Sequence, residues 1–175
     1  DNIIVSSDCE KMLATASSLG VQTHNRDKYF ASSEASNSEF FENLAKSIDA
    51  KYIMYSPVTC PLISLETYND CISSFKRNEE IESLVTVSNV KHHMWLDDKP
   101  INYDISNSPN SQDLPDIVAV TYGICILSRD NMLKYRNVIT ENPTFKILDE
   151  IESVDIDTEF DFMVAEVIYQ KLMNI

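Results

Sequence analysis

Short apolar runs alternate with longer amphipathic stretches along this chain. Runs rich in β-branched and aromatic residues predict strands, because such side chains pack well on a pleated surface. Stretches whose apolar positions recur every three or four residues predict helices. The expected strands are residues 3–5, 21–23, 52–55, 83–88, 117–127 and 145–148, and the expected helices are residues 9–19, 38–48, 65–76, 131–135 and 159–173.

Strands separated by helices predict an α/β fold, with a mostly parallel sheet flanked by helices, in one domain that spans residues 1–175. Residues 89–115 interrupt the alternation with adjacent histidines, the single tryptophan and a polar run, so we expect them to leave the sheet as an excursion. In parallel sheets, ligands bind at the carboxyl ends of strands. The segments of interest therefore follow Val5, Tyr55 and Ser88 or lie near Val154.

Single residues mark where some elements begin, end or turn. Ser7 or Asp8 is expected to cap the first helix. Gly20 is expected to take the left-handed conformation that ends this helix. Pro57 and Pro61 forbid regular structure after the strand at 52–55 and predict a stiff loop there.

The net charge of −14 changes the list of expected partners. A field of this sign repels phosphate backbones and anionic lipid head groups, so nucleic acid and membranes are not expected to bind. No apolar run is long enough for a membrane span, and residues 1–5 lack the features of a secretion signal, so we expect a cytoplasmic location.

Glycine and cysteine usage narrows the chemistry. With Gly20 and Gly123 as the only glycines, neither a dinucleotide-binding glycine fingerprint nor a P-loop can be written. The cysteines form no CxxC pair and have no basic neighbour that would activate a thiol, so we expect reduced and mostly buried thiols. They are Cys9, Cys60, Cys71 and Cys125.

The sharpest candidate for chemistry is the pair Asp155 and Asp157. On an extended backbone, residues two apart project to the same side, so the two carboxylates repel each other unless a hard cation such as Mg²⁺ binds between them. The simpler interpretation is that Asp157 and Thr158 cap the last helix, with acidic residues in its first turn. Both interpretations can hold together.

Other candidates are weaker alone. Arg26 can bind a base carbonyl or a phosphate, or be a solvated arginine. Ala35, Ser36 and Asn37 open a helix whose free N–H groups form a generic site for polar ligands. The adjacent histidines at 92–93 point to opposite faces of a strand, so a structural or interface role is favoured over a metal site.

Read together, the motifs resemble those of the acylneuraminate cytidylyltransferase family. The similarity covers nearly the whole chain in the correct order. IIVSSD at 3–8 resembles IVSTD, and RDKYFASSEASN at 26–37 resembles RPxELAxDxASS. PVTCPLI at 57–63 resembles QPTSPLR, and the strand at 83–88 with its following histidines resembles SVVS and HH. QDLP at 112–115 resembles QxLP, YGICI at 122–126 falls at NGAIY, and SVDIDTEFD at 153–161 is similar to SIDIDTELD.

The resemblance implies a Rossmann-like nucleotidyltransferase that transfers CMP from CTP to a sugar acid and releases pyrophosphate. Asp155 and Asp157 would be the catalytic carboxylates that hold Mg²⁺. Arg26, Ala35, Ser36 and Asn37 would bind the nucleotide. The sugar pocket would contain Thr59, Pro61, Gln112 and Tyr122.

The resemblance also implies a homodimer, with residues 89–115 as the dimerisation element. On this basis Arg26 and Thr59 are expected to share one cleft with the two carboxylates. The family's first motif, a strand with a lysine-bearing loop, has no counterpart in the sequence, and Pro57, Ile63 and Tyr122 replace its Gln, Arg and Asn. The alternative is therefore a non-catalytic relative or fragment that acts as a binding or dimerisation module.

Overall fold

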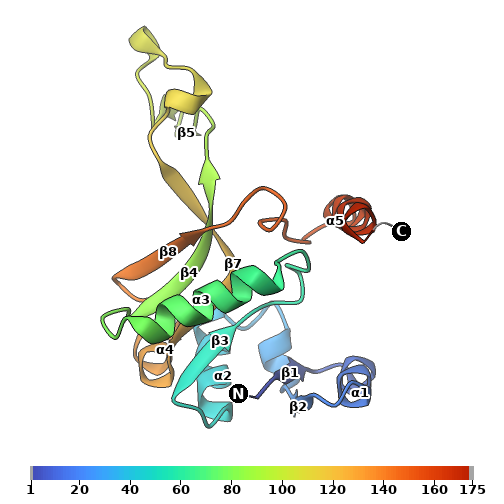
Figure 1. The fold of residues 1–175 in the computed structure, drawn as a ribbon. Coiled ribbons are helices and arrows are strands. Elements are labelled where there is room, and N and C mark those ends of the chain that lie inside the picture. The colour runs from blue at the N-terminus through green and yellow to red at the C-terminus, as the bar shows by residue number, and fades with distance from the viewer. Residues whose placement is uncertain (1, 174–175) are drawn as a thin grey trace. The chain divides into compact units, whose positions relative to one another are not determined.

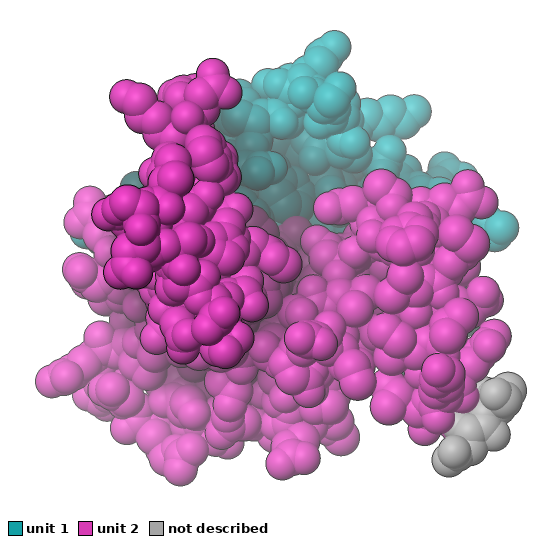
Figure 2. Space-filling model, turned by 90° about the horizontal axis from the view of Figure 1, so that it is seen from above, with its two compact units in different colours: residues 1–51, 129–138 teal, residues 52–128, 139–175 magenta. Residues whose placement is uncertain are grey.

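The computed structural model describes residues 2–173 (Figure 1). The chain divides into two compact units, residues 1–51 with 129–138 and residues 52–128 with 139–175, which Figure 2 draws in different colours. None of the described helices has the length and apolar character needed to cross a bilayer. The single domain that the sequence predicts stays a prediction.

A strand–helix–strand element opens the first unit. Strands β1 (Ile4–Ser7) and β2 (Gln22–Asn25) pair in parallel and are joined by helix α1 (Glu10–Ser18). Gly20 has φ of +76°, as predicted for the residue that ends this helix. The predicted cap is wrong, because the N-cap residue is Cys9 and no side chain caps the helix. Ser7 instead accepts the Cys9 N–H in the turn that precedes the helix.

The rest of this unit is helical. It contains η1 (Lys28–Ala31), α2 (Asn37–Ser47) and α4 (Arg129–Tyr135). The guanidinium of Arg129 donates to the carbonyl of Ala45 at 2.7 Å, which joins the start of α4 to α2 across a long stretch of sequence. Met132 and Ala45 are fully buried. Residues 129–138 therefore belong with the N-terminal part of the chain, which no local pattern indicates.

The second unit is built on a four-stranded sheet in the order β3-β7-β4-β8. Its strands are β3 (Tyr52–Tyr55), β4 (Ser83–Val90), β7 (Ile117–Ser128) and β8 (Pro143–Ile147). Strands β3, β4 and β8 run in one direction, and β7 lies between β3 and β4 in the opposite direction. The α/β class is confirmed, with β7 as the antiparallel member of the sheet.

Helix α3 (Leu65–Arg77) covers one face of this sheet (Figure 1). The buried core beneath it joins side chains from the helix, the sheet and the loops. Its members are Cys60, Ile63, Cys71, Leu84, Ile124, Ile126 and Leu148. The loop after β3 is thus part of the core, since both Cys60 and Ile63 come from it.

Strand β7 is interrupted by a wide bulge opposite Thr86. Pairing with β4 shifts between Val85 and Val87, so the residues from Thr121 to Ile124 lie opposite one residue. The Thr86 hydroxyl accepts the Ile124 N–H at 2.9 Å and donates to the Ile124 carbonyl, and the Thr121 hydroxyl donates to the Thr86 carbonyl at 3.0 Å. These hydrogen bonds replace the regular ladder inside a buried region.

The predicted excursion is seen as an arm that projects from the sheet (Figure 1), but it begins after Val90, because Asn89 and Val90 still pair with β7. It contains the hairpin β5 (Trp95–Leu96) and β6 (Lys99–Pro100), followed by η2 (Ile105–Asn107) and η3 (Ser111–Asp113). Asp97 and Asp98, at the hairpin turn, have φ of 48° and 60°. Buried Asn102 organises the base of the hairpin, since it donates to the His92 carbonyl and accepts the Met94 N–H.

The last helix, α5 (Glu159–Leu172), follows an irregular segment after β8. Ala165 is the one buried residue of this helix. Most of its other large apolar side chains, among them Phe160, Phe162 and Met163, are exposed, whereas Val164 and Ile168 are half-buried.

We expect Thr86→Val to lower the free energy of unfolding by about 1–3 kcal/mol, because both main-chain groups of Ile124 lose their buried hydrogen-bond partner. Denaturant-induced unfolding measures the change. Thr144→Val is the matched control, since it makes the same substitution at an exposed position of β8, and it should change stability by less than about 0.5 kcal/mol. Equal effects in both variants would contradict the role of the Thr86 hydroxyl.

Candidate functional site

The two predicted carboxylates come from a segment that lies against the loop after β3. The N–H of Ile156, the residue between them, donates to the carbonyl of Thr59 at 2.9 Å. Asp155 is half-buried and Asp157 is exposed. The structure therefore brings together Thr59 and the acidic pair, three predicted site residues from distant parts of the sequence.

A second contact joins the same two segments. The Cys60 thiol, 4% exposed, lies 3.6 Å from Asp155 Oδ1 and 3.8 Å from the carbonyl oxygen of Thr121. Thr121 begins the bulge of β7 and is followed by Tyr122, another predicted site residue. Three segments, from the β3 loop, the β7 bulge and the acidic stretch before α5, thus meet around one buried thiol.

The backbone of the bulge is strained where it approaches this point. Tyr122 has φ of +57°, a left-handed conformation that costs about 1–3 kcal/mol for a residue with a side chain. At Gly123 a Cβ would lie 2.5 Å from Cδ1 of Ile63, so the Ile63 side chain occupies space that a larger residue at 123 would require it to leave. Sparsely populated backbone conformations of this kind are concentrated at functional sites.

The start of α5 uses a different set of side chains. Thr158 is the N-cap, and its capping box with Asp161 satisfies the N–H groups of both residues. Hydrogen bonds from the Thr158 hydroxyl and N–H hold the pKa of Asp161 below its usual range. The capping interpretation is therefore correct for Thr158 and Asp161. Asp157 lies one residue before the cap, and its carboxylate is not part of the capping box.

The acidic pair has the donor chemistry of a magnesium site. Carboxylate oxygens are hard ligands, and Mg²⁺ commonly takes one or two of them together with water and substrate phosphates. Within residues 2–173 no group of three or more His, Cys, Asp or Glu side chains could hold a metal ion. Two carboxylates would fit Mg²⁺ together with water or phosphate ligands, and binding of the ion stays a prediction.

The predicted nucleotide-binding residues lie in the first unit. The guanidinium of Arg26 donates to the carbonyl and hydroxyl of Ser6 and lies 4.9 Å from the ring centroid of Phe40. Arg26 is thus half-buried at the carboxyl end of β1, and the interpretation as a freely solvated arginine is wrong.

Helix α2 begins with a capping box. Ser36 accepts the Glu39 N–H at 3.3 Å, and the Glu39 carboxylate accepts the Ser36 N–H at 2.9 Å. The Ser36 hydroxyl and N–H both donate to the Glu39 carboxylate, and these hydrogen bonds hold its pKa below its usual range. A ligand at this helix would have to approach the neighbouring Ala35 and Asn37. The nucleotide-binding role of these residues stays a prediction, as does one cleft shared by Arg26 and the carboxylates.

Two predicted sugar-pocket residues differ in position. Pro61 is exposed and directly follows Cys60, so it belongs to the segment that meets the acidic pair. Gln112 lies in η3 on the arm and is exposed. His93, also on the arm, lies edge-to-face against Tyr103 and 3.1 Å from the carbonyl of Pro109, which agrees with the structural role favoured for the histidines.

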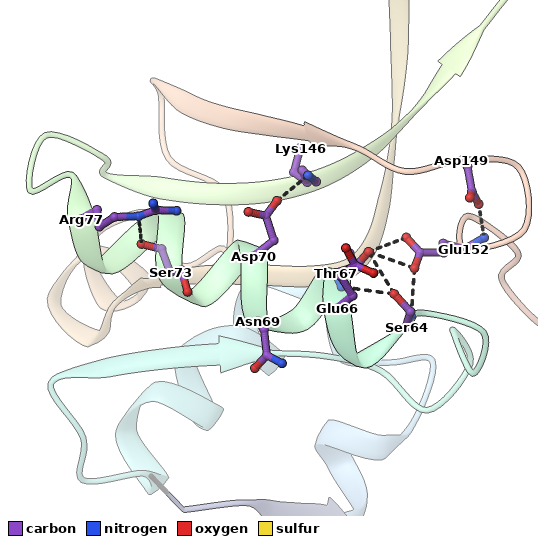
Figure 3. Close-up of a pocket in the computed structure, with 10 residues that line it drawn as sticks. All are labelled: Ser64, Glu66, Thr67, Asn69, Asp70, Ser73, Arg77, Lys146, Asp149 and Glu152. Carbon is purple, nitrogen blue, oxygen red and sulfur yellow. Dashed lines mark hydrogen bonds and ion pairs between the residues drawn. The ribbon is translucent and has the colours of Figure 1, made fainter.

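A separate groove of about 590 Å³ lies between α3 and the strand and loop that contain Lys146 and Glu152 (Figure 3). Its side chains largely satisfy one another. The Lys146 ammonium lies 2.5 Å from Asp70, and the Glu152 carboxylate accepts the Ser64 N–H and the Thr67 hydroxyl at the start of α3. The Lys146 hydrogen bond is the main cause of the lowered pKa of Asp70. This groove is lined by structural polar pairs and does not contain the acidic pair.

Cys60 and Thr121 are the contributors that reasoning from sequence missed. Burial, together with the nearby charge of Asp155, raises the pKa of Cys60 from 9.0 to about 12. Burial likewise raises the pKa of Cys71 to about 11 and of Cys125 to about 12. Thiols with such values are not nucleophiles near neutral pH, as the sequence predicted. The sequence feature that could have indicated a role for Cys60 in the site is its position between Pro57 and Pro61, directly after a strand.

These thiols predict a loss of stability in alkaline solution. Cys60, Cys71 and Cys125 hold their protons more tightly in the folded chain than in the unfolded chain, where the pKa is near 9.0. Their contribution is therefore complete below about pH 9 and is lost as pH rises toward 11–12. Denaturation at pH 7.5 and pH 10.5 should show this decrease, and substitution of the three thiols by alanine should reduce the difference. If the free energy of unfolding of that variant decreases with pH as much as that of the parent, the contribution of the thiols is contradicted.

The chain is similar in fold to several solved structures. The chain is similar to 4-diphosphocytidyl-2C-methyl-D-erythritol synthase from Anaerococcus prevotii, with a TM-score of 0.69 and 12% identity over 97% of this chain and 79% of that one. It is also similar to CMP:2-keto-3-deoxy-manno-octonic acid synthetase in complex with CTP, with a TM-score of 0.67 and 9% identity over 98% and 81% of the two chains.

A third similar structure is the bifunctional IspDF from Campylobacter jejuni, with a TM-score of 0.61 and 11% identity over 93% of this chain and 41% of that one. No family model matches the sequence, and no curated protein is similar to it. At these identities the likeness shows the fold alone. It does not show membership of the acylneuraminate cytidylyltransferase family.

Proposed function

We propose that the chain is a CTP-dependent cytidylyltransferase domain that transfers CMP to a sugar acid or a related sugar, with release of pyrophosphate. The observation that carries the proposal is the acidic segment bound to the loop after β3, with the Ile156 N–H donating to Thr59. Ligands bind at such carboxyl ends in α/β sheets. The similarity of the fold to a synthetase in complex with CTP supports the choice of nucleotide.

In the proposed reaction, a hydroxyl oxygen of the acceptor forms a bond to the α-phosphorus of CTP. The bond from that phosphorus to the bridging oxygen breaks, pyrophosphate leaves with its electron pair, and the proton of the hydroxyl passes to water. Mg²⁺, when bound, would offset the negative charge that develops on the phosphates. Asp155 and Asp157 would hold the ion, and their attachment to Thr59 would keep them oriented toward the substrate.

The remaining roles are assigned by the resemblance in the motifs. Arg26 and the start of α2 would bind cytosine and ribose. The sugar pocket would contain Thr59, Pro61, Gln112 and Tyr122. Because the chain has a net charge of −14 and two carboxylates alone repel a triphosphate, positively charged groups are needed near the bound nucleotide. Arg26, held rigidly by Ser6, would supply one such charge.

A thermal-shift experiment with CTP and Mg²⁺ tests the proposal. Ligand at about 100 times its dissociation constant stabilises the folded state by about 2.7 kcal/mol, which raises the melting temperature by about 5–10 °C for a chain of this size. Asp157→Asn should abolish the shift, and Asp130→Asn, at an exposed position of α4, should keep it. No shift in the parent chain at millimolar CTP would contradict the proposal.

A pyrophosphate-release assay with candidate sugar acids separates the two functional alternatives. Release that depends on CTP, Mg²⁺ and Asp157 supports the transferase. A thermal shift without release in any acceptor mixture would instead support the non-catalytic relative that binds nucleotide.

We also propose that the arm forms a homodimer. Apolar side chains on the hairpin and after it are exposed, with Trp95 at 53%, Leu96 at 62% and Ile105 at 63%. Trp95 lies edge-to-face near Tyr103, so the exposed surface is held in a defined shape. A second copy of the same arm would bury these side chains by an isologous contact.

Leu96→Glu should convert the dimer to a monomer, because it places a charge within the apolar contact. Light scattering coupled to size-exclusion chromatography measures the mass. Leu65→Glu, at a similarly exposed leucine at the start of α3, is the control and should remain dimeric. A parent chain that is monomeric at all concentrations would contradict the dimer.

A further inference from the structure

The side chain of Cys60 lies where three segments meet, and its neighbours are not those of an ordinary core cysteine. Its sulfur faces two oxygen acceptors, Asp155 Oδ1 at 3.6 Å and the Thr121 carbonyl at 3.8 Å. Cys71, by comparison, belongs to the same core cluster but is packed from within helix α3 among apolar side chains. Both thiols are buried, so the difference lies in what each sulfur faces.

The thiol can donate one proton, and Asp155 is the better acceptor. Its oxygen is the nearer of the two and carries charge, and hydrogen bonds to ionised groups are shorter and stronger than neutral ones. Asp155 is half-buried, so water competes less for this oxygen than it would on an open surface. The hydrogen bond therefore orients one edge of the carboxylate toward the core.

The main-chain hydrogen bond between Ile156 and Thr59 helps to fix the orientation of the Asp155 carboxylate. Because Ile156 donates to Thr59, and Cys60 directly follows Thr59, the acidic segment is held at two successive points by two successive residues of the loop. Rotation about the Asp155 side chain is limited by the thiol, and displacement of its backbone is limited by Thr59. The second oxygen of the Asp155 carboxylate takes no part in either contact, and Asp157 is exposed.

We propose that Cys60 is a positioning residue for the acidic pair: it holds Asp155 in the orientation that binds a divalent cation with the nucleotide. This proposal rests on the proposed function. Partners that orient the ligands of a metal typically change its affinity 10- to 100-fold when they are removed. Cys60 touches neither substrate nor product in this role.

The test compares alanine substitutions at two buried cysteines of the same core. Binding of Mn²⁺ together with CTP is measured by electron paramagnetic resonance, which reports both free and bound ion. Mn²⁺ takes the same oxygen ligands as Mg²⁺. Cys60→Ala should weaken binding by about tenfold, whereas Cys71→Ala, which also removes a buried thiol, should bind as the parent does. Cys60→Ser keeps a donor and should bind more tightly than Cys60→Ala.

Amide hydrogen exchange without metal provides an independent reading. Exchange of the Ile156 N–H should become faster in Cys60→Ala than in Cys71→Ala at equal global stability, because the acidic segment loses one of its two attachments. Unchanged Ile156 exchange in Cys60→Ala would overturn the proposal. So would equal Mn²⁺ affinity in Cys60→Ala and the parent.

Failure of the proposed function has a different signature. If the parent chain and all variants bind no Mn²⁺ with CTP, the cytidylyltransferase proposal fails, and the metal-positioning role of Cys60 fails with it. If the parent binds and Cys60→Ala binds equally, the proposed function stands and the role of Cys60 alone is overturned.

Discussion

The bulge in β7 is the constraint on which the candidate site depends. The Thr86 hydroxyl takes the place of a regular ladder partner for Ile124, which allows the chain between Thr121 and Ile124 to leave the plane of the sheet. Gly123 then gives room for Ile63, and this fixes the loop that carries Thr59 and Cys60. The acidic segment binds to that loop. A hydroxyl at the centre of the sheet thus determines, through packing, where two carboxylates lie near its edge.

Several carboxylates outside the site are compensated by neighbouring donors. Glu39 and Asp161 complete capping boxes, Glu152 accepts hydrogen bonds at the start of α3, and Asp70 pairs with Lys146. Asp157 is exposed and outside such an arrangement, and Asp155 accepts a hydrogen bond from a weak thiol donor. Carboxylates that are only weakly compensated retain their capacity to bind a cation, and in this respect the acidic pair differs from Glu39, Asp161, Glu152 and Asp70.

The arm differs from the rest of the chain in having a defined shape together with exposed apolar side chains. A two-stranded hairpin has no core of its own, and here its shape depends on buried Asn102 and on the edge-to-face rings of His93, Tyr103 and Trp95. These contacts hold the hairpin in place while its outer apolar side chains remain in solvent. An element that is rigid and apolar on the outside suits association with another chain.

The sequence alone determined the kind and place of most elements, because helical and strand periodicities are local and strong in this chain. It also determined the acidic pair, the left-handed Gly20 and the arm that leaves the sheet. Tertiary structure decided what local patterns do not encode. The antiparallel direction of β7, the bulge at Thr86 and the meeting of Cys60 with Asp155 all depend on residues far apart in the sequence. Their positions follow from long-range packing and buried hydrogen bonds, and a local pattern contains neither.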